Sequence, residues 1–90
     1  IPLGTAIFMI FYVYMLKGVN NKITKTYVGY TNNLALRLKK HNSGRGAKAT
    51  RGYKWKIIYK KKFYDKRLAM SFEYKLKKDQ KRRKYLLSLN

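Results

Sequence analysis

The chain is predicted to form a single α+β domain, in which helices flank a small three-stranded antiparallel sheet in the order β-β-α-β-α-α. Short runs of aromatic and β-branched residues alternate with stretches whose apolar residues recur every four positions. Clusters of Gly and Asn separate these runs. At 90 residues, of which 46% are hydrophobic, the chain can bury one modest core. The domain is expected over residues 9–90, with Met9 as a candidate start and Ile1–Phe8 as an N-terminal extension or an expression remnant.

Three segments read as strands, at residues 11–16, 26–30 and 55–63. The turn residues Gly18–Lys22 join the first two strands as a hairpin. The apolar run Ala6–Leu16 is shorter than the roughly 20 residues that cross a bilayer, and it lacks the basic start of a signal peptide. We therefore expect a buried strand there, no membrane partner, and a cytoplasmic, nucleoid-associated protein.

Leucines with helical spacing indicate a first helix over residues 34–41. Thr31, Asn32 or Asn33 supplies its N-cap, Leu34 and Leu38 share its buried stripe, and Gly44 ends it.

Two further helices are expected after Asp65 and Asp79, which have the side chains of N-caps. The residues expected to face the core are Leu68, Phe72 and Leu76 in the second helix, and Tyr85, Leu86 and Leu89 in the third.

The charge balance indicates a polyanionic partner. The chain has 23 Lys and Arg against 3 Asp and Glu, a net charge of +20, whose self-repulsion a nucleic acid would relieve. It has no cysteine and one histidine, which excludes disulfide scaffolds, thiol nucleophiles and multi-histidine metal sites.

Arg37 and His41 are candidate catalytic residues. Four positions apart on the expected helix, they share a face beside the leucine stripe. A guanidinium can grip a phosphate with two hydrogen bonds, and an imidazole can move a proton. The alternative is a solvated helix face.

Glu73 is the only glutamate in a strongly basic chain, and it is the candidate metal ligand. Mg²⁺ often takes one or two carboxylates and completes its shell with water and phosphate oxygens. The alternative is an ordinary helical ion pair with Lys77.

Tyrosines on the first two strands are candidate proton carriers or hydrogen-bond donors to a phosphate. Tyr12 and Tyr14 share one face of their strand, and Tyr27 and Tyr30 lie on the second strand. A cationic pocket would favour the phenolate form. The alternative is simple packing in the core.

The loop Asn42–Lys54 is rich in glycine and basic residues and lacks the phosphate-loop pattern of nucleotide-binding proteins. We expect it to contact a nucleic-acid backbone or to be a mobile loop. The basic stretch Lys75–Lys84 forms a second cationic surface. The residues assigned to DNA binding are Lys40, Arg45, Lys48, Arg51, Lys77 and Lys78.

In their order along the chain, these residues resemble the motifs of the GIY-YIG nuclease domain. The first motif stands as Tyr12-Val13-Tyr14, where Tyr12 replaces the usual first glycine, and the second as Tyr27-Val28-Gly29. Arg37 and His41 follow, and Glu73 matches the metal-binding glutamate. The stretch HNSGRGAKATRG, with the Trp that follows it, is similar to single-domain bacterial members and to the catalytic domain of eukaryotic flap- and junction-cutting endonucleases.

The resemblance implies cleavage of a DNA phosphodiester that depends on Mg²⁺, with Mn²⁺ as a substitute. Glu73 would hold the metal, Arg37 would stabilise the scissile phosphate, and Gly29 would let the backbone approach Tyr27 closely. Tyr14, Tyr27 or His41 would activate the water. The substrate would be branched, nicked or distorted DNA in repair or recombination, chosen by the basic surface or by a protein partner.

Two other functions fit the composition. One is a non-catalytic nucleic-acid-binding protein, associated with RNA or the ribosome, and the other is a protein that binds a membrane surface through its basic face. Glu73, Arg37 and His41 favour the nuclease, because a pure binder gains nothing from a carboxylate that faces phosphate.

Overall fold

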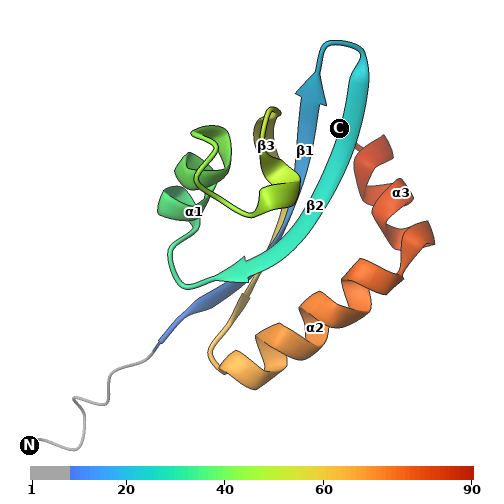
Figure 1. The fold of residues 1–90 in the computed structure, drawn as a ribbon. Helices are drawn as coiled ribbons and strands as arrows, with labels where there is room; N and C mark the ends of the chain where they lie inside the picture. Colours follow the sequence, from blue (N-terminus) through green and yellow to red (C-terminus); the bar gives the residue numbers. More distant parts are fainter. Residues whose placement is uncertain (1–8) are drawn as a thin grey trace, which may run out of the picture.

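The computed structural model describes residues 9–90 and confirms the predicted α+β fold and its element order (Figure 1). The strands and helices are β1 (Phe11–Asn20), β2 (Ile23–Thr31), α1 (Leu34–Asn42), the 3₁₀ turn η2 (Lys48–Thr50), β3 (Lys54–Phe63), α2 (Lys66–Lys78) and α3 (Gln80–Ser88). The expected extension Ile1–Phe8 lies outside the described residues. Within residues 9–90, no helix has the length and apolar character needed to cross a membrane.

The sheet is antiparallel with the strand order β2-β1-β3, so β1 lies in the centre. Its residues Val13, Met15 and Leu16 are fully buried, and Tyr14 is 1% exposed. A strand covered on both faces needs apolar residues at successive positions rather than at every second one. This burial explains the uninterrupted apolar run seen in the sequence.

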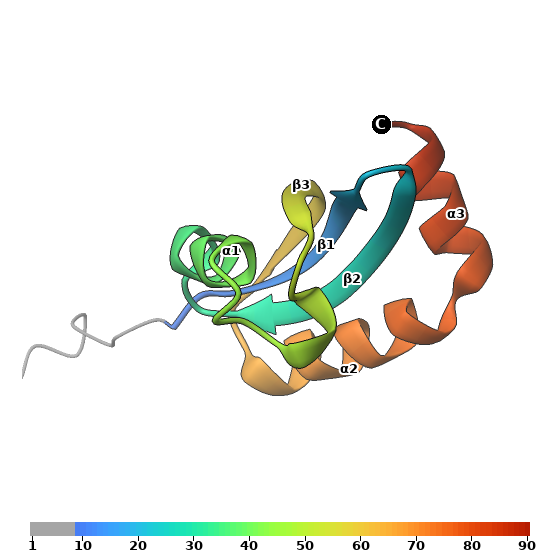
Figure 2. The same cartoon turned by 45° about the horizontal axis from the view of Figure 1, so that its top comes forward.

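The two faces of the sheet carry separate hydrophobic clusters. Phe11, Val13 and Met15 of β1 pack with residues of α2 and α3 on one face. Tyr14 and Leu16 point to the other face, where they pack with Trp55, α1 and the loop that follows it. Figure 2 shows this arrangement, with α1 and the loop on one side of the sheet and α2 and α3 wrapped around the other.

The β1–β2 hairpin is longer than the sequence predicted. Both strands extend through the expected turn to a two-residue connection, Asn21-Lys22, where Asn21 has a positive φ of 55°. Asparagine tolerates this left-handed conformation better than other non-glycine residues. The turn is therefore tighter than the residues Gly18–Lys22 suggested.

The helix caps agree with the sequence prediction. Asn33 caps α1 by accepting a hydrogen bond from the Leu36 amide, and Asp65 and Asp79 cap α2 and α3 in the same way. Leu34 and Leu38 of α1 are half-buried against the Tyr14 cluster, as predicted.

The predicted core faces of α2 and α3 need correction. Leu68 is 59% exposed, and the buried stripe of α2 is Ala69, Phe72 and Leu76. The small Ala69 side chain is fully buried and lets the first turns of the helix approach the sheet closely. In α3, Tyr85 and Leu89 are exposed, while Leu86 and Leu87 contact the core. A helix of nine residues presents only about two turns to the core, so few of its apolar residues can be covered.

Candidate active site

A hydrogen bond between Tyr14 and His41 lies at the centre of the candidate site. The Tyr14 hydroxyl oxygen is 2.9 Å from His41 Nε2, and both side chains are 1% exposed. Tyr14 comes from the central strand and His41 from the last turn of α1, so the sheet and the helix together fix the contact. The sequence placed His41 beside the leucine stripe, but the structure buries it fully.

The second ring nitrogen of His41 also has a partner. His41 Nδ1 lies 2.9 Å from the Oγ1 atom of Thr50, which is completely buried. Thr50 in turn donates to the Ala47 carbonyl over 2.7 Å. Both nitrogens of the imidazole are thus engaged, and the ring is held in one orientation.

Gly29 on β2 makes room for the Tyr14 ring. A Cβ atom at this position would lie 2.5 Å from the Tyr14 hydroxyl and 3.1 Å from the Tyr27 ring. The sequence reading linked Gly29 to a close approach beside Tyr27. The closer constraint comes from Tyr14, whose ring passes directly over the glycine.

Tyr27 and Arg37 complete the group around His41. The Tyr27 ring centre is 4.9 Å from that of His41 and 6.4 Å from that of Tyr14. Arg37 is half-buried on α1, and its pKa is raised, chiefly by the nearby Tyr14 phenol and also by Tyr27. The guanidinium therefore lies near both phenols.

The environment keeps the Tyr14–His41 pair neutral. Burial lowers the pKa of His41 to about 4, and the nearby charge of Arg37 acts in the same direction. Burial raises the pKa of Tyr14, against the opposing influence of Arg37. At pH 7 the histidine is therefore a neutral imidazole with one ring proton, and the tyrosine keeps its proton.

Glu73 lies on α2, and its charge contributes to the raised pKa of Tyr14. Its side chain is 16% exposed and forms an ion pair with Lys77 at 3.5 Å. Residues 9–90 contain no group of three or more His, Asp or Glu side chains able to hold a metal. A single carboxylate suits Mg²⁺, which keeps waters and phosphate oxygens in its shell.

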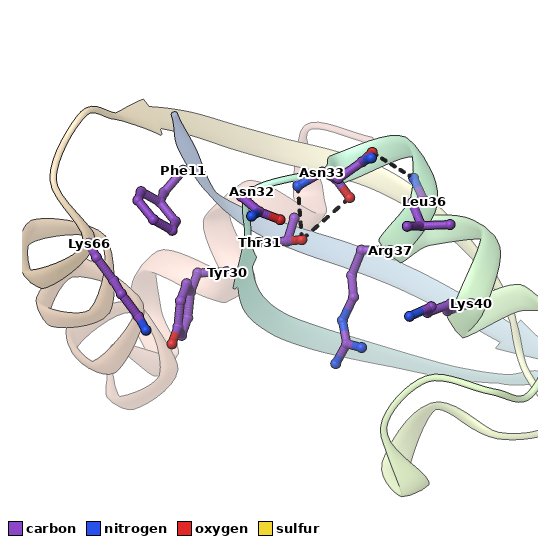
Figure 3. A pocket seen from close by; sticks show the side chains of 9 residues that line it. All are labelled: Phe11, Tyr30, Thr31, Asn32, Asn33, Leu36, Arg37, Lys40 and Lys66. Carbon is purple, nitrogen blue, oxygen red and sulfur yellow. Dashed lines mark hydrogen bonds between the residues drawn. The ribbon is translucent and has the colours of Figure 1, made fainter. Parts of the chain in front are cut away.

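An open cavity of about 480 Å³ adjoins Arg37 at the end of β2. Figure 3 shows Arg37 and Lys40 extending from α1 on one side of it, with Lys66, Tyr30 and Phe11 on the other. Three cations thus line the cavity, and one of them, Arg37, connects it to the Tyr14–His41 pair, whose own side chains do not line it. An anionic ligand is favoured in such a place.

The remaining predicted DNA-binding residues lie on exposed surfaces. Arg45, Lys48 and Arg51 are exposed on the loop after α1, which folds back over His41. Lys77 and Lys78 are exposed in the last turn of α2. The loop cations lie near the site, whereas Lys77 is paired with Glu73 and Lys78 lies over the Tyr74 ring.

Sequence reasoning missed three residues that hold the site together. Asn42 accepts from the Trp55 amide over 2.6 Å and donates to the Trp55 carbonyl over 3.1 Å. The indole Nε1 of Trp55 donates to the Thr50 carbonyl over 2.7 Å. These bonds tie α1, the loop and β3 together around His41. Their only sequence signal is a lone tryptophan after a glycine-rich loop.

Comparison with known proteins supplies a family. The sequence matches the GIY-YIG catalytic domain over residues 10–86. It is 46% identical over 67 residues to a UPF0213 protein of Oceanobacillus iheyensis, with 73% of this chain and 74% of that protein covered. Over 68 residues it is 48% identical to a UPF0213 protein of Clostridium perfringens, with 74% and 70% covered.

A solved structure is also similar. The solution NMR structure of a UPF0213 protein from Bacillus halodurans shares 38% sequence identity with this chain, and the TM-score is 0.51. The similarity covers 91% of this chain and 86% of that protein. Sequence and structure comparisons therefore point to the same group of small bacterial proteins.

Proposed function

The chain belongs to the GIY-YIG family of endonuclease domains, and from that premise we propose that it is a divalent-metal-dependent DNA endonuclease. It hydrolyses phosphodiester bonds in branched, nicked or otherwise distorted DNA during repair or recombination. One observation carries the proposal. A buried tyrosine is hydrogen-bonded to a neutral histidine, near an arginine that lines a cationic cavity.

The scissile phosphate binds at Arg37. The guanidinium lines the cavity and also lies near Tyr14, so a phosphate bound to it would lie close to the buried Tyr14–His41 pair. Lys40 and Lys66 hold the adjoining phosphates of the strand across the cavity. Arg37 stabilises the negative charge that grows on the phosphate oxygens in the transition state, an effect often worth about 2.7–4 kcal/mol.

Tyr14 and His41 transfer the proton of the attacking water. The imidazole is neutral at pH 7 and lies 2.9 Å from the phenol oxygen. As the phenol proton passes to the histidine, the phenol oxygen takes a proton from the water, and the water oxygen attacks phosphorus. The bond from phosphorus to the leaving strand oxygen then breaks, and that oxygen takes a proton from solvent. General base catalysis of this kind contributes roughly 10²- to 10⁴-fold to the rate.

Tyr27 is assigned to orient the phosphate or the water. Its ring packs against His41 and, edge-on, against Trp55, so its position is well determined. Both phenols contribute to the raised pKa of Arg37, Tyr14 more than Tyr27. Tyr27 thus holds the guanidinium in place from the second strand.

Glu73 is assigned to hold Mg²⁺, or Mn²⁺ as a substitute. The bound ion would supply the positive charge that favours ionisation of the phenol and stabilises the phosphate. Lys77 neutralises Glu73 in the free protein and, being 50% exposed, can turn away into solvent. The basic loop residues Arg45, Lys48 and Arg51 hold the flanking DNA.

Cleavage of labelled DNA by the purified protein tests the proposal. A flap, a splayed arm, a four-way junction and a linear duplex are incubated with Mg²⁺, with Mn²⁺ or with EDTA. We expect metal-dependent cuts that disappear in Glu73→Gln, while DNA binding is kept or becomes tighter. Asp79→Asn is the matched control, because it removes one carboxylate at a helix cap and leaves the site intact.

The Glu73–Lys77 ion pair favours one other candidate, a non-catalytic nucleic-acid-binding protein, because it gives the carboxylate a structural role. In that case the protein binds every substrate tightly and cuts none with either metal. Cutting by Glu73→Gln at the wild-type rate, with unchanged metal dependence, would instead remove Glu73 from the metal site.

A further inference from the structure

Thr50 belongs to the loop, yet it lies deeper than any other loop residue. Its side chain is completely buried, and its Oγ1 atom is 2.9 Å from His41 Nδ1. No part of the proposed reaction uses this hydroxyl directly. Because this buried hydroxyl contacts a candidate catalytic histidine, it can influence the reaction only through that histidine.

The hydrogen bonds of Thr50 have a defined direction. Thr50 Oγ1 lies 2.7 Å from the Ala47 carbonyl oxygen, and two oxygens at that distance need a proton between them. The carbonyl can only accept, so the proton is that of the Thr50 hydroxyl. Because a hydroxyl has one proton, Thr50 has none left for His41 and must accept from Nδ1.

We infer that Thr50 is a positioning residue, which holds the imidazole proton on Nδ1 of His41 and so leaves Nε2 free to accept the proton of Tyr14. In a neutral imidazole only one nitrogen carries a proton, so the bond to Thr50 decides the state of Nε2. The whole chain then runs in one direction. Tyr14 donates to Nε2, Nδ1 donates to Thr50, and Thr50 donates to Ala47.

The loop is built to keep Thr50 in place. Ala47 and Thr50 close the single 3₁₀ turn η2, and the Thr50 amide also donates to the Ala47 carbonyl. Trp55 Nε1 holds the Thr50 carbonyl from β3. Gly46 lies so close to His41 that a Cβ atom there would overlap Nδ1, so the glycine lets the turn reach the ring.

This inference rests on the proposed function, in which Nε2 receives the tyrosine proton. With the proton on Nε2 instead, that nitrogen would be a donor facing the Tyr14 hydroxyl. It could then not accept the proton of Tyr14. Groups that orient a working histidine through its other nitrogen typically change activity about 10- to 100-fold when they are removed. Thr50 acts only through His41 and touches no substrate.

The tautomer can be measured without any activity. His41 is the only histidine of the chain, so the long-range ¹H–¹⁵N correlations of its ring are free of overlap. At pH 7 we expect a protonated Nδ1 and an unprotonated Nε2 in the wild-type protein. A protonated Nε2 would overturn the inference, whatever the cleavage assay shows.

Substitutions then link the tautomer to the reaction. Thr50→Val keeps the shape but removes the acceptor, and we expect loss of the pure Nδ1–H form together with a kcat about 10- to 100-fold lower at unchanged KM. Thr50→Ser keeps the hydroxyl and should restore both the Nδ1–H tautomer and the wild-type kcat. Thr24→Val, on the exposed end of β2, is the matched control and should leave both unchanged.

Two results with the variants would also overturn the inference. One is a Thr50→Val protein that keeps the Nδ1–H form. The other is a changed tautomer with an unchanged kcat. If Thr50→Val does not fold, the wild-type spectrum still decides the tautomer, and Thr50→Ser decides whether a hydroxyl suffices. If the wild-type protein cuts nothing, the proposed function fails, whereas the spectrum still reports on Thr50 alone.

Discussion

Gly29 lies directly beneath the end of the Tyr14 side chain, where a Cβ atom would come within 2.5 Å of the hydroxyl and 2.8 Å of Cζ. The closest approach of β2 to the candidate site is therefore made by backbone alone. The Tyr14 ring is held between this strand and His41. Its position depends on the absence of a side chain at Gly29.

Gly29→Ala should displace the Tyr14 hydroxyl from His41 and lower kcat at least about ten-fold, in line with the sensitivity of catalysis to displacements near 1 Å. Single-turnover cleavage at saturating protein measures this rate. Thr24→Ala, on the exposed end of the same strand, is the comparison. Equal rates for wild type and Gly29→Ala would show that the Tyr14–His41 contact is not needed.

Arg37→Ala should reduce turnover far more than DNA affinity. The guanidinium borders the phenols and the cavity, so its main effect is expected on transition-state charge, with a loss of about 10²-fold or more in kcat. Binding titrations and single-turnover rates separate the two effects. Lys39→Ala removes an exposed cation from the same helix and is the control. A loss of affinity as large as the loss of rate would reduce Arg37 to a simple phosphate contact.

Acid should destabilise the protein through His41. Its pKa is 6.5 in an unperturbed chain and about 4 in the fold, where Tyr14, Tyr27 and Arg37 face it. Between these values the unfolded chain binds a proton that the folded protein does not, so the free energy of unfolding falls as pH falls. The loss approaches on the order of 3 kcal/mol below pH 4.

Urea unfolding at about pH 7 and about pH 4.5 measures this effect, with His41→Asn as the reference that lacks the titrating group. The stability difference between wild type and His41→Asn should shrink as pH falls. A difference that stays constant across this range would mean that His41 keeps an ordinary pKa.

Lys48 should contribute to DNA affinity mainly through a phosphate contact. It is exposed on the loop beside His41, so its loss should weaken binding to all DNA substrates alike. The slope of log K against log[salt] should become shallower by about 0.9 in Lys48→Ala, as expected for one neutralised phosphate. Fluorescence anisotropy at several salt concentrations measures both the DNA affinity and this slope. An unchanged slope would place Lys48 outside the interface.

The sequence predicts the fold well because its signals are local. The N-caps Asn33, Asp65 and Asp79 act on backbone amides two or three residues away, so their neighbours suffice to find them. The buried side of a helix depends instead on what packs against it. Leu68 and Tyr85 fit a helical stripe equally well, yet the sheet meets neighbouring positions.

The same distinction holds for the candidate site. Arg37 and His41 could be selected from residue type and spacing, whereas Tyr14 is separated from Tyr12 only by the resemblance to the GIY-YIG motifs. The structure brings all three together. Thr50 could not be selected, because its role depends on a loop that folds back over α1 and on a turn closed by Ala47. Nothing in the letters GRGAKATRG distinguishes a buried threonine from an exposed one.

Trp55 is an intrinsic fluorescent probe of the loop that covers His41. It is the single tryptophan of the chain, 5% exposed, and its indole nitrogen is bonded to the backbone of the loop at Thr50. Its emission is therefore sensitive to the closure of the loop over His41. Detachment of the loop would break that bond, bring water to the indole and shift the emission to longer wavelength. Stopped-flow fluorescence of the unlabelled protein would therefore detect any detachment of the loop.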